Sequence, residues 1–178
     1  QRGFHKNLDT MEKLYSVILN SFTSMGLIFF GGYANAMYSK YMPKRLKVKL
    51  QKIPDFDVLS EDPMRSATIL KERLTEHNYK NITITKRDNI GEIIATHYEI
   101  KVGKETVAFI YKPLACHSYN TLHIHGTTIK IATIDTMLSF YLAFIYSNRP
   151  YYDDDRILCM AHKLFVVQQK NRLKQKGL

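Results

Sequence analysis

The sequence contains no tryptophan and only two cysteines, Cys116 and Cys159, among its 178 residues. Two cysteines are too few for a disulfide framework or for a zinc site made of cysteine alone. Acidic residues are also scarce, because 16 Asp and Glu stand against 26 Lys and Arg, which gives a formal net charge of +10. This excess of positive charge favours partners that carry phosphate groups, or an anionic membrane surface.

Long apolar runs are absent as well. The most apolar stretches, 25–30 and 137–146, are far shorter than the ~20 residues that span a bilayer, so we expect no membrane segment. The chain opens at Gln1 without a basic and then apolar leader, and we therefore expect an intracellular protein. Hydrophobic residues make up 45% of the chain, which is enough for one folded domain. The missing initiator methionine and the lysine-rich end suggest a piece of a longer protein.

Hydrophobic periodicity predicts a mixture of helices and strands. Apolar residues three and four apart predict helices over 9–24, 34–41, 63–77, 135–146 and from 153 onward. The predicted N-terminal caps are Asp9, Ser60 or Asp62, Asp135 and Asp153. Apolar runs and alternation predict strands over 27–30, 55–59, 82–86, 93–102, 106–111, 122–125 and 128–131. We therefore expect an α+β fold with a mixed sheet and flanking helices.

Two short motifs suggest chemistry. The glycine pair Gly31-Gly32 lies at the start of a predicted helix, where glycine lets the backbone approach a triphosphate and free N–H groups favour anionic oxygens. Further along, Asp55 and Asp57 alternate with Phe56, so both carboxylates point to one face of a strand. Such a pair can hold two Mg²⁺ ions, which would position a triphosphate and stabilise the leaving pyrophosphate. Together the motifs predict metal-dependent nucleotidyl transfer.

The order of these motifs resembles the nucleotidyltransferase superfamily that includes DNA polymerase beta and poly(A) polymerases. A more specific resemblance is to the poly(A) polymerases of large nucleocytoplasmic DNA viruses. It is carried by Phe30-Gly31-Gly32-Tyr33-Ala34, Pro54-Asp55-Phe56-Asp57-Val58-Leu59-Ser60 and Tyr111-Lys112-Pro113. The run 122–131 and Pro150-Tyr151-Tyr152-Asp153 continue the similarity, which covers residues 10–170 of this sequence.

This resemblance implies a template-independent RNA 3′-adenylyltransferase with a polymerase beta-like fold. ATP would be the substrate, an RNA 3′ end the acceptor, and Mg²⁺ or Mn²⁺ the metal, bound by Asp55 and Asp57. Gly31, Gly32 and Tyr33 would seat the nucleotide. The resemblance also implies a homodimer, without a membrane partner, in the host cytoplasm or the virion of a large DNA virus. We expect residues 1–133 to form the nucleotidyltransferase core and residues 134–178 a helical C-terminal extension of the same compact unit.

One position departs from the family pattern, which has a third acid on a later strand. Alignment through 107–113 places Ala108 where that acid is expected, and an alanine cannot bind metal. If Gly103-Lys104 is a two-residue turn, Glu99 pairs with Ala108 and its carboxylate could reach the vacated position. Glu99 is therefore our predicted third catalytic carboxylate. Two other interpretations of Ala108 remain open: the chain is a pseudo-enzyme, or the alanine was introduced to silence the protein.

Two alternative functions also remain open. A catalytically inactive subunit of the same fold would bind RNA or a sister subunit, and Ala108 favours this interpretation. A nucleotidyltransferase that acts on a non-RNA acceptor, such as a protein hydroxyl or an antibiotic, would use the same glycine and aspartate motifs.

The sequence contains three weaker patterns as well. His123 and His125 share a strand face and could form half of a zinc site, but no further ligand stands at suitable spacing. Alternating positive charges over 44–52 are typical of a solvated face, although they lie near the glycine pair. Tyr33, Tyr38 and Tyr41 could stack on RNA bases, but the core is the favoured location.

Overall fold

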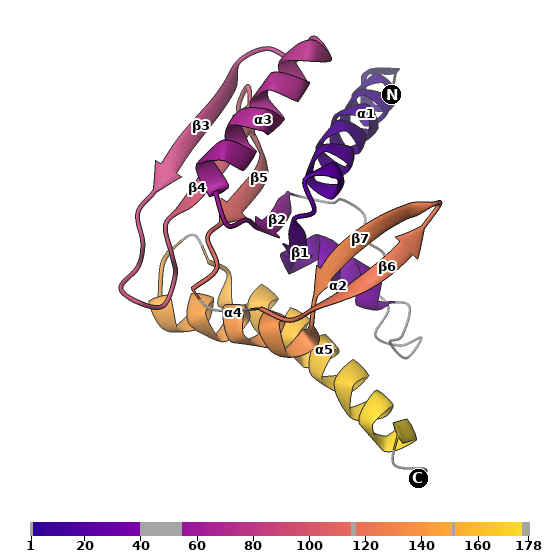
Figure 1. Cartoon of the computed structure of the whole chain (residues 1–178), viewed down its shortest axis with the longest axis vertical. Helices are drawn as coiled ribbons and strands as arrows, with labels where there is room; N and C mark the ends of the chain where they lie inside the picture. Colours follow the sequence, from indigo (N-terminus) through magenta and orange to yellow (C-terminus); the bar gives the residue numbers. More distant parts are fainter. Residues whose placement is uncertain (1, 40–54, 115–116, 151, 176–178) are drawn as a thin grey trace.

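The computed structural model describes residues 2–39, 55–114, 117–150 and 152–175 (Figure 1). The elements in chain order are α1 (Arg2–Ser24), β1 (Ile28–Phe30), α2 (Gly31–Ser39), β2 (Phe56–Leu59), α3 (Pro63–Glu76), β3 (Ile82–Arg87), β4 (His97–Val102), β5 (Glu105–Tyr111), β6 (Tyr119–Ile124), β7 (Thr127–Ala132), α4 (Ile134–Ser147) and α5 (Asp154–Gln175). The predicted α+β class is confirmed. The basic stretch 44–52 and Tyr41 lie outside the described residues.

The strands form one seven-stranded mixed sheet in the order β3-β4-β5-β2-β1-β7-β6. β1 pairs antiparallel with β2 and parallel with β7, while β2 pairs parallel with β5. In the antiparallel pair Phe30 lies opposite Asp57. The end of β1 therefore meets the start of β2, which brings the glycine pair beside the aspartates although they are far apart in the sequence.

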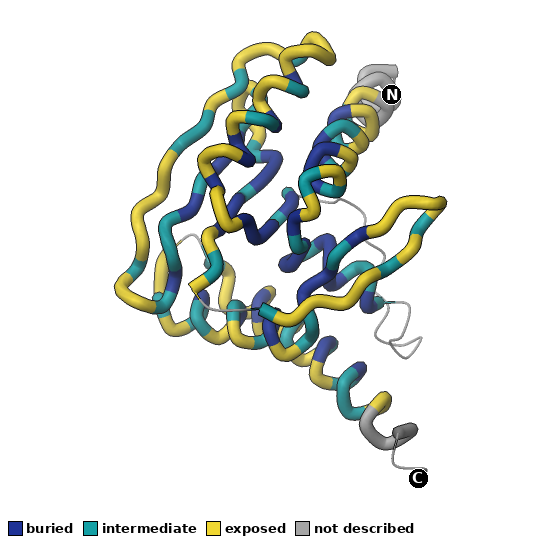
Figure 2. The backbone as a smooth tube through the Cα atoms, in the orientation of Figure 1, coloured by how far each residue is buried: buried dark blue, intermediate teal, exposed yellow. Residues whose placement is uncertain are grey.

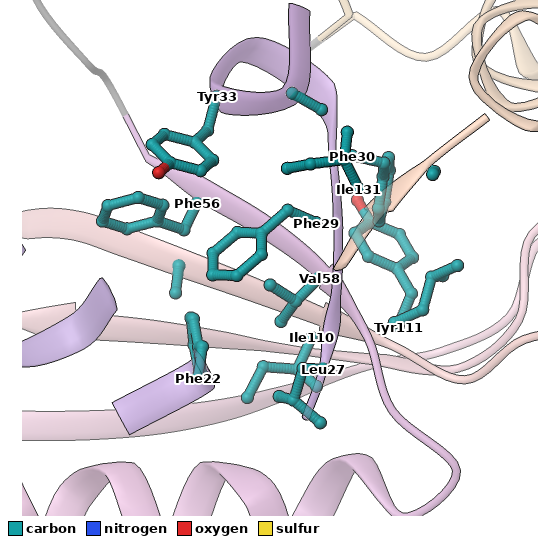
Figure 3. Close-up of a cluster of buried hydrophobic side chains, with 14 of the residues drawn as sticks. Phe22, Leu27, Phe29, Phe30, Tyr33, Phe56, Val58, Ile110, Tyr111 and Ile131 are labelled. Carbon is teal, nitrogen blue, oxygen red and sulfur yellow. The ribbon is translucent and has the colours of Figure 1, made fainter. Parts of the chain in front are cut away.

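One face of the sheet packs against α1 and α3, which lie side by side in Figure 1. Phe56 is at the centre of this core, and its ring makes edge-to-face contacts with Tyr15, Phe22, Phe29 and Tyr33. Figure 3 shows this cluster, and Figure 2 shows that burial is concentrated between the sheet and the two helices. Edge-to-face aromatic packing adds to the stabilisation gained from buried apolar area.

The other face of the central strands packs against α4. Phe140 of α4 stacks on Phe30, with ring centroids 4.5 Å apart, and also contacts Tyr111 at the end of β5. α5 follows and packs on α4, and its second half runs away from the sheet (Figure 1). Among the described helices, none combines the length and the apolar character needed to cross a bilayer.

Two of the predicted helix starts are wrong. α1 begins at Arg2 and not behind Asp9, so Asp9 lies inside the helix and does not cap it. α4 is capped by Thr133, whose hydroxyl accepts a hydrogen bond from the Thr136 N–H at 3.4 Å, so Asp135 lies inside the first turn. The other caps are confirmed: the Asp62 and Asp153 carboxylates each accept a backbone N–H at 3.1 Å, from Arg65 and Arg156 respectively.

A β-bulge makes the observed register between β4 and β5 differ from the predicted register. Val102 pairs with Glu105 as predicted, but the register shifts between Ile100 and Lys101, so that Lys101 pairs with Thr106 and Ile100 with Ala108. Val107 is the extra residue, and one extra residue moves every following side chain to the other face. Glu99 consequently pairs with Phe109, and its predicted pairing with Ala108 is wrong.

Candidate active site

Gly31 lies directly against Asp57. Its φ of +63° belongs to a conformation that favours glycine, and an added Cβ would overlap the Asp57 carboxylate, whose Cγ would lie 2.8 Å away. Backbone strain and lack of space both require glycine here. At Gly32, by contrast, a Cβ would meet no atom within 4 Å, so the space beside this residue is open.

Asp55 and Asp57 line a pocket of about 380 Å³ together with Gly31 and Gly32. Both aspartates are half-buried. Burial raises the pKa of Asp57 well above its ordinary value, and the neighbouring charge of Asp55 raises it further. Burial also raises the pKa of Asp55, while Arg156 lowers it. The pocket therefore holds two carboxylates whose charged forms are poorly solvated and repel each other, a situation that a bound cation relieves.

Arg156 lines the same pocket from the first turns of α5. Its charge lowers the pKa of Asp55 and Asp57, so it lies near both. Among the described side chains it forms no direct ion pair with either carboxylate. A guanidinium that faces two acids at a distance is placed to bind an anionic group, such as a phosphate, that enters between them.

Aromatic side chains form the remaining walls. The Tyr111 ring stacks on the His97 ring with centroids 4.4 Å apart, and Phe144 stacks on Tyr152 at 4.7 Å. Burial lowers the pKa of His97, which keeps its imidazole neutral at neutral pH. Phe109 lines the pocket as a half-buried residue. Flat aromatic walls next to cationic groups suit a nucleotide base.

Glu99 lines the pocket too, but its carboxylate already has partners. Arg87 donates two hydrogen bonds to Oε2, one of them from Nε at 3.0 Å. Thr106 Oγ1 donates to Oε1 at 2.7 Å, and Lys101 Nζ lies 3.6 Å from the same oxygen. Burial alone would raise the pKa of Glu99, yet these donors outweigh burial and lower it. Glu99 is therefore a stable carboxylate that is bound to protein groups.

Two further expectations need correction. Tyr33, which the motif places with the nucleotide, packs into the core against Phe29 and Phe56 and does not line the pocket. Figure 3 shows its ring beside these phenylalanines. Ala108 is fully buried opposite Ile100 and Phe56 on the core face, so its position is not the vacated place of a pocket acid. Tyr38 is also a core residue, and its hydroxyl donates to the Ala132 carbonyl at 2.8 Å.

The donor set suits a hard divalent cation. Mg²⁺ is commonly bound by one or two carboxylates together with substrate phosphates and water, and Asp55 and Asp57 supply such a pair. Among the described residues no group of three or more His, Cys, Asp or Glu side chains could hold a metal ion. This part of the chain therefore provides no third ligand for the zinc half-site at His123 and His125.

Periodicity does not single out three residues of this pocket, namely Arg87, Phe109 and Arg156. Arg87 follows a predicted strand and Arg156 follows a predicted cap, but neither position carries a local signal that shows what lies across from it. Phe109 reaches the pocket face only because Val107 is bulged. Strand alternation alone assigns Phe109 to the wrong face.

Neither a protein-family model nor a curated protein sequence matches the chain. The structure is similar to the crystal structure of the Megavirus polyadenylate synthase, with a TM-score of 0.66 and 18% identity over 86% of this chain and 30% of that chain. It is also similar to an antigenic nucleotidyltransferase-like protein from Paracoccidioides brasiliensis, with a TM-score of 0.51 and 15% identity over 88% of this chain and 75% of that chain. The chain thus spans less than a third of the viral synthase. Its mixed sheet and flanking helices form a nucleotidyltransferase fold, as the resemblance implied.

Proposed function

We propose that this chain transfers adenylyl groups from ATP to the 3′ end of RNA without a template, and that it requires Mg²⁺ or Mn²⁺. The observation that carries the proposal is the contact between Gly31 and the Asp57 side chain, which places a helix start and two carboxylates around one pocket. The similarity in fold to a viral polyadenylate synthase supports RNA as the acceptor. The net charge of +10 supports it as well, because phosphate contacts dominate nucleic-acid affinity.

Each group in the pocket has a role that follows from its chemistry. Backbone N–H groups at the start of α2, at Gly31 and Gly32, donate to phosphate oxygens. Asp55 and Asp57 hold the divalent cation, which when bound would neutralise the triphosphate and stabilise the leaving pyrophosphate. Arg156 binds the phosphates from the opposite wall. The chain thus orients the α-phosphate and surrounds it with opposite charge, which is the main source of catalysis in phosphoryl transfer.

One observation favours a second candidate, a nucleotide-binding subunit without transferase activity. A general base for the attacking hydroxyl needs a free acceptor oxygen, and Glu99 already binds Arg87, Thr106 and Lys101. On the pocket face of β5 the described residues are Thr106, Phe109 and Tyr111, which include no carboxylate. A chain of this kind would bind ATP and metal without extending RNA.

Primer extension separates these functions. Labelled oligo(A), ATP and either Mg²⁺ or Mn²⁺ should give a ladder of extended products with the unaltered chain. Asp55→Asn should abolish the ladder, because an amide cannot replace a metal-bound carboxylate. Glu76→Gln is the matched control, since it removes an exposed carboxylate at the end of α3, away from the pocket, and should leave extension unchanged.

The other results have distinct meanings. Binding of Mn²⁺ and ATP that is lost in Asp55→Asn, without any extension, would support the inactive subunit. Extension that persists in Asp55→Asn would contradict the assignment of the metal ligands. Absence of oligo(A) binding at ~50 mM salt, where electrostatic contacts are strong, would contradict RNA as the acceptor.

A further inference from the structure

We propose that Phe109 and Arg87 form the subsite for the terminal nucleotide of the acceptor RNA, and that Glu99 positions Arg87. This inference rests on the proposed function, because it concerns the acceptor end of the same pocket. It assigns Glu99 a role different from the third catalytic carboxylate that the sequence predicts.

The sheet register sets the layout of this subsite. Asp57 of β2, Phe109 of β5 and Glu99 of β4 occupy directly opposed positions on three neighbouring strands. Neighbouring strands lie ~4.8 Å apart, so the Cα atoms of Asp57 and Glu99 are separated by roughly 10 Å, with Phe109 between them. Paired catalytic ions lie only ~3.5–4 Å apart. The pocket thus has a metal-binding end at Asp57 and a distinct end at Glu99, joined by an aromatic ring.

The Glu99 carboxylate is built to hold a guanidinium. Its side chain is only 6% exposed, and a buried carboxylate is costly unless charge partners and hydrogen-bond donors surround it. Both carboxylate oxygens have donors: Thr106 binds one, and Arg87 binds the other with two of its nitrogens. The donors occupy the oxygens that a metal or an attacking hydroxyl would use. This arrangement fixes the direction of Arg87.

Arg87 has donors left for a ligand. Glu99 accepts from Nε and Nη2, whereas Nη1 donates to no atom of the described residues. The Arg87 side chain is 51% exposed and lines the pocket. A guanidinium fixed along one edge and open along the other can bind a phosphate with little further loss of side-chain entropy.

Phe109 supplies the second element of nucleotide recognition. Its ring is half-buried, lines the pocket and contacts the His97 and Tyr111 rings at centroid distances of 6.3 and 6.4 Å. These neighbours restrain the ring, so it forms a fixed platform on which a base can stack. An aromatic platform beside a guanidinium and next to the two aspartates fits a single-stranded 3′ end whose hydroxyl points toward the metal-binding end.

Fluorescence anisotropy with labelled oligo(A), in the absence of ATP, tests the subsite directly. Arg87→Ala should weaken binding about tenfold, the value of one charge-assisted contact. Phe109→Ala should weaken it to a similar extent, and Phe109→Tyr should not. Lys86→Ala is the matched control, because it removes an exposed positive charge from the neighbouring position of β3, whose side chain points to the other face. Equal effects of Arg87→Ala and Lys86→Ala would overturn the proposal.

Glu99→Gln distinguishes positioning from catalysis. If Glu99 positions Arg87, the variant should raise the KM for the primer, leave kcat within about twofold and keep the affinity for Mn²⁺ and ATP. If Glu99 is instead a metal ligand or a general base, kcat should collapse or Mn²⁺ affinity should fall, and either result would overturn the positioning role.

A double variant serves as the control for loss of folding. Arg87→Ala alone leaves the buried Glu99 without its main partner, whereas Arg87→Ala with Glu99→Gln leaves no unpaired buried charge. The double variant should remain folded and should lose oligo(A) affinity to the same extent as Arg87→Ala; retained affinity would overturn the subsite. If the unaltered chain extends no primer but these variants still lose oligo(A) binding, the transferase proposal fails and the subsite stands.

Discussion

The two faces of β2 differ in what they contribute to the molecule. On one face Phe56 and Val58 are 1% and 0% exposed and pack among aromatic rings from α1, β1 and α2. On the other face lie the half-buried carboxylates of Asp57 and of Asp55, which directly precedes the strand, and burial raises the pKa of both. This short segment therefore carries stabilising contacts on one side and destabilising charges on the other. Changes on the core face should act on stability, and changes on the pocket face on nucleotide chemistry.

Ala108→Asp should have the largest effect on stability. It places a carboxylate on the fully buried core face between Ile100 and Phe56, and an uncompensated buried charge costs about 4–5 kcal/mol. Urea denaturation should show this loss or an unfolded chain. Phe109→Asp, one residue further along, directs its carboxylate into the pocket and should remain folded. An Ala108→Asp variant that folds normally and gains transferase activity would contradict the β5 register.

Phe56→Ala should reduce the free energy of unfolding by about 3–4 kcal/mol, because it removes a central ring from a closely packed aromatic cluster. Denaturant titration measures this loss. Val58→Ala at the same face provides a comparison and should cost less, since fewer buried atoms are removed. A Phe56→Ala variant as stable as the unaltered chain would contradict the assignment of this face to the core.

Gly31→Ala and Gly32→Ala should differ in their effects on stability and on nucleotide binding. Alanine at Gly31 combines an unfavourable positive φ with overlap against Asp57, so we expect a loss of roughly 2 kcal/mol and of nucleotide binding. Alanine at Gly32 meets no neighbouring atom and should change stability by less than ~0.5 kcal/mol. Thermal unfolding and ATP titration measure both properties. Equal stability of the two variants would show that the contact between Gly31 and Asp57 is absent in solution.

Asp57→Asn should stabilise the protein while it abolishes transfer. The raised pKa of Asp57 means that its charged form is disfavoured in the folded state, and a neutral amide also removes the repulsion with Asp55. At pH 7 without metal, the melting temperature should rise by about 2–4 °C. Differential scanning calorimetry in the presence of a chelator tests this. A lower melting temperature would show that the carboxylate makes stabilising contacts.

Glu99→Gln should have the smallest effect on the free energy of unfolding, and this effect should depend on pH. The pKa of Glu99 is lower in the folded state, so the unfolded state binds more protons and the stabilisation is present above the unfolded value of 4.5. This stabilisation should disappear as the pH falls through the folded pKa. The difference in free energy of unfolding between the unaltered chain and Glu99→Gln should therefore shrink below pH 4.5. A difference that stays constant from pH 7 to pH 3 would contradict the ionised pair with Arg87.

Local patterns predicted the placement of side chains at the aspartate end of the pocket. Alternation through Asp55-Phe56-Asp57-Val58 assigned each side chain to its correct face because a regular strand repeats every two residues. The glycine pair marked the start of α2, where Gly31 adopts a positive φ that favours glycine. The helix caps at Asp62 and Asp153 were also predictable, because a short acidic side chain accepts hydrogen bonds from the free N–H groups at a helix start.

The end of the pocket at Glu99 could not be predicted in the same way. A bulge is a property of two paired strands, and the sequence of β5 alone does not show that Val107 has no partner on β4. The resulting shift of one residue moved Ala108 into the core and Phe109 into the pocket. Arg87 was also hidden, because its partner Glu99 lies on another strand and no periodic pattern links the two.

The sequence by itself determined the order of helices and strands, the faces of β2 and the glycine with positive φ at the start of α2, because these depend on short-range backbone geometry and burial. Only the tertiary structure decided which charges meet in the pocket. The pairing of β3 with β4 placed Arg87 beside Glu99, and the register of β4 on β5 placed Glu99 opposite Phe109. The packing of α5 brought Arg156 to the pocket of the aspartates. Such pairings join residues that are distant along the chain, and their energies depend on burial and separation that exist only after folding.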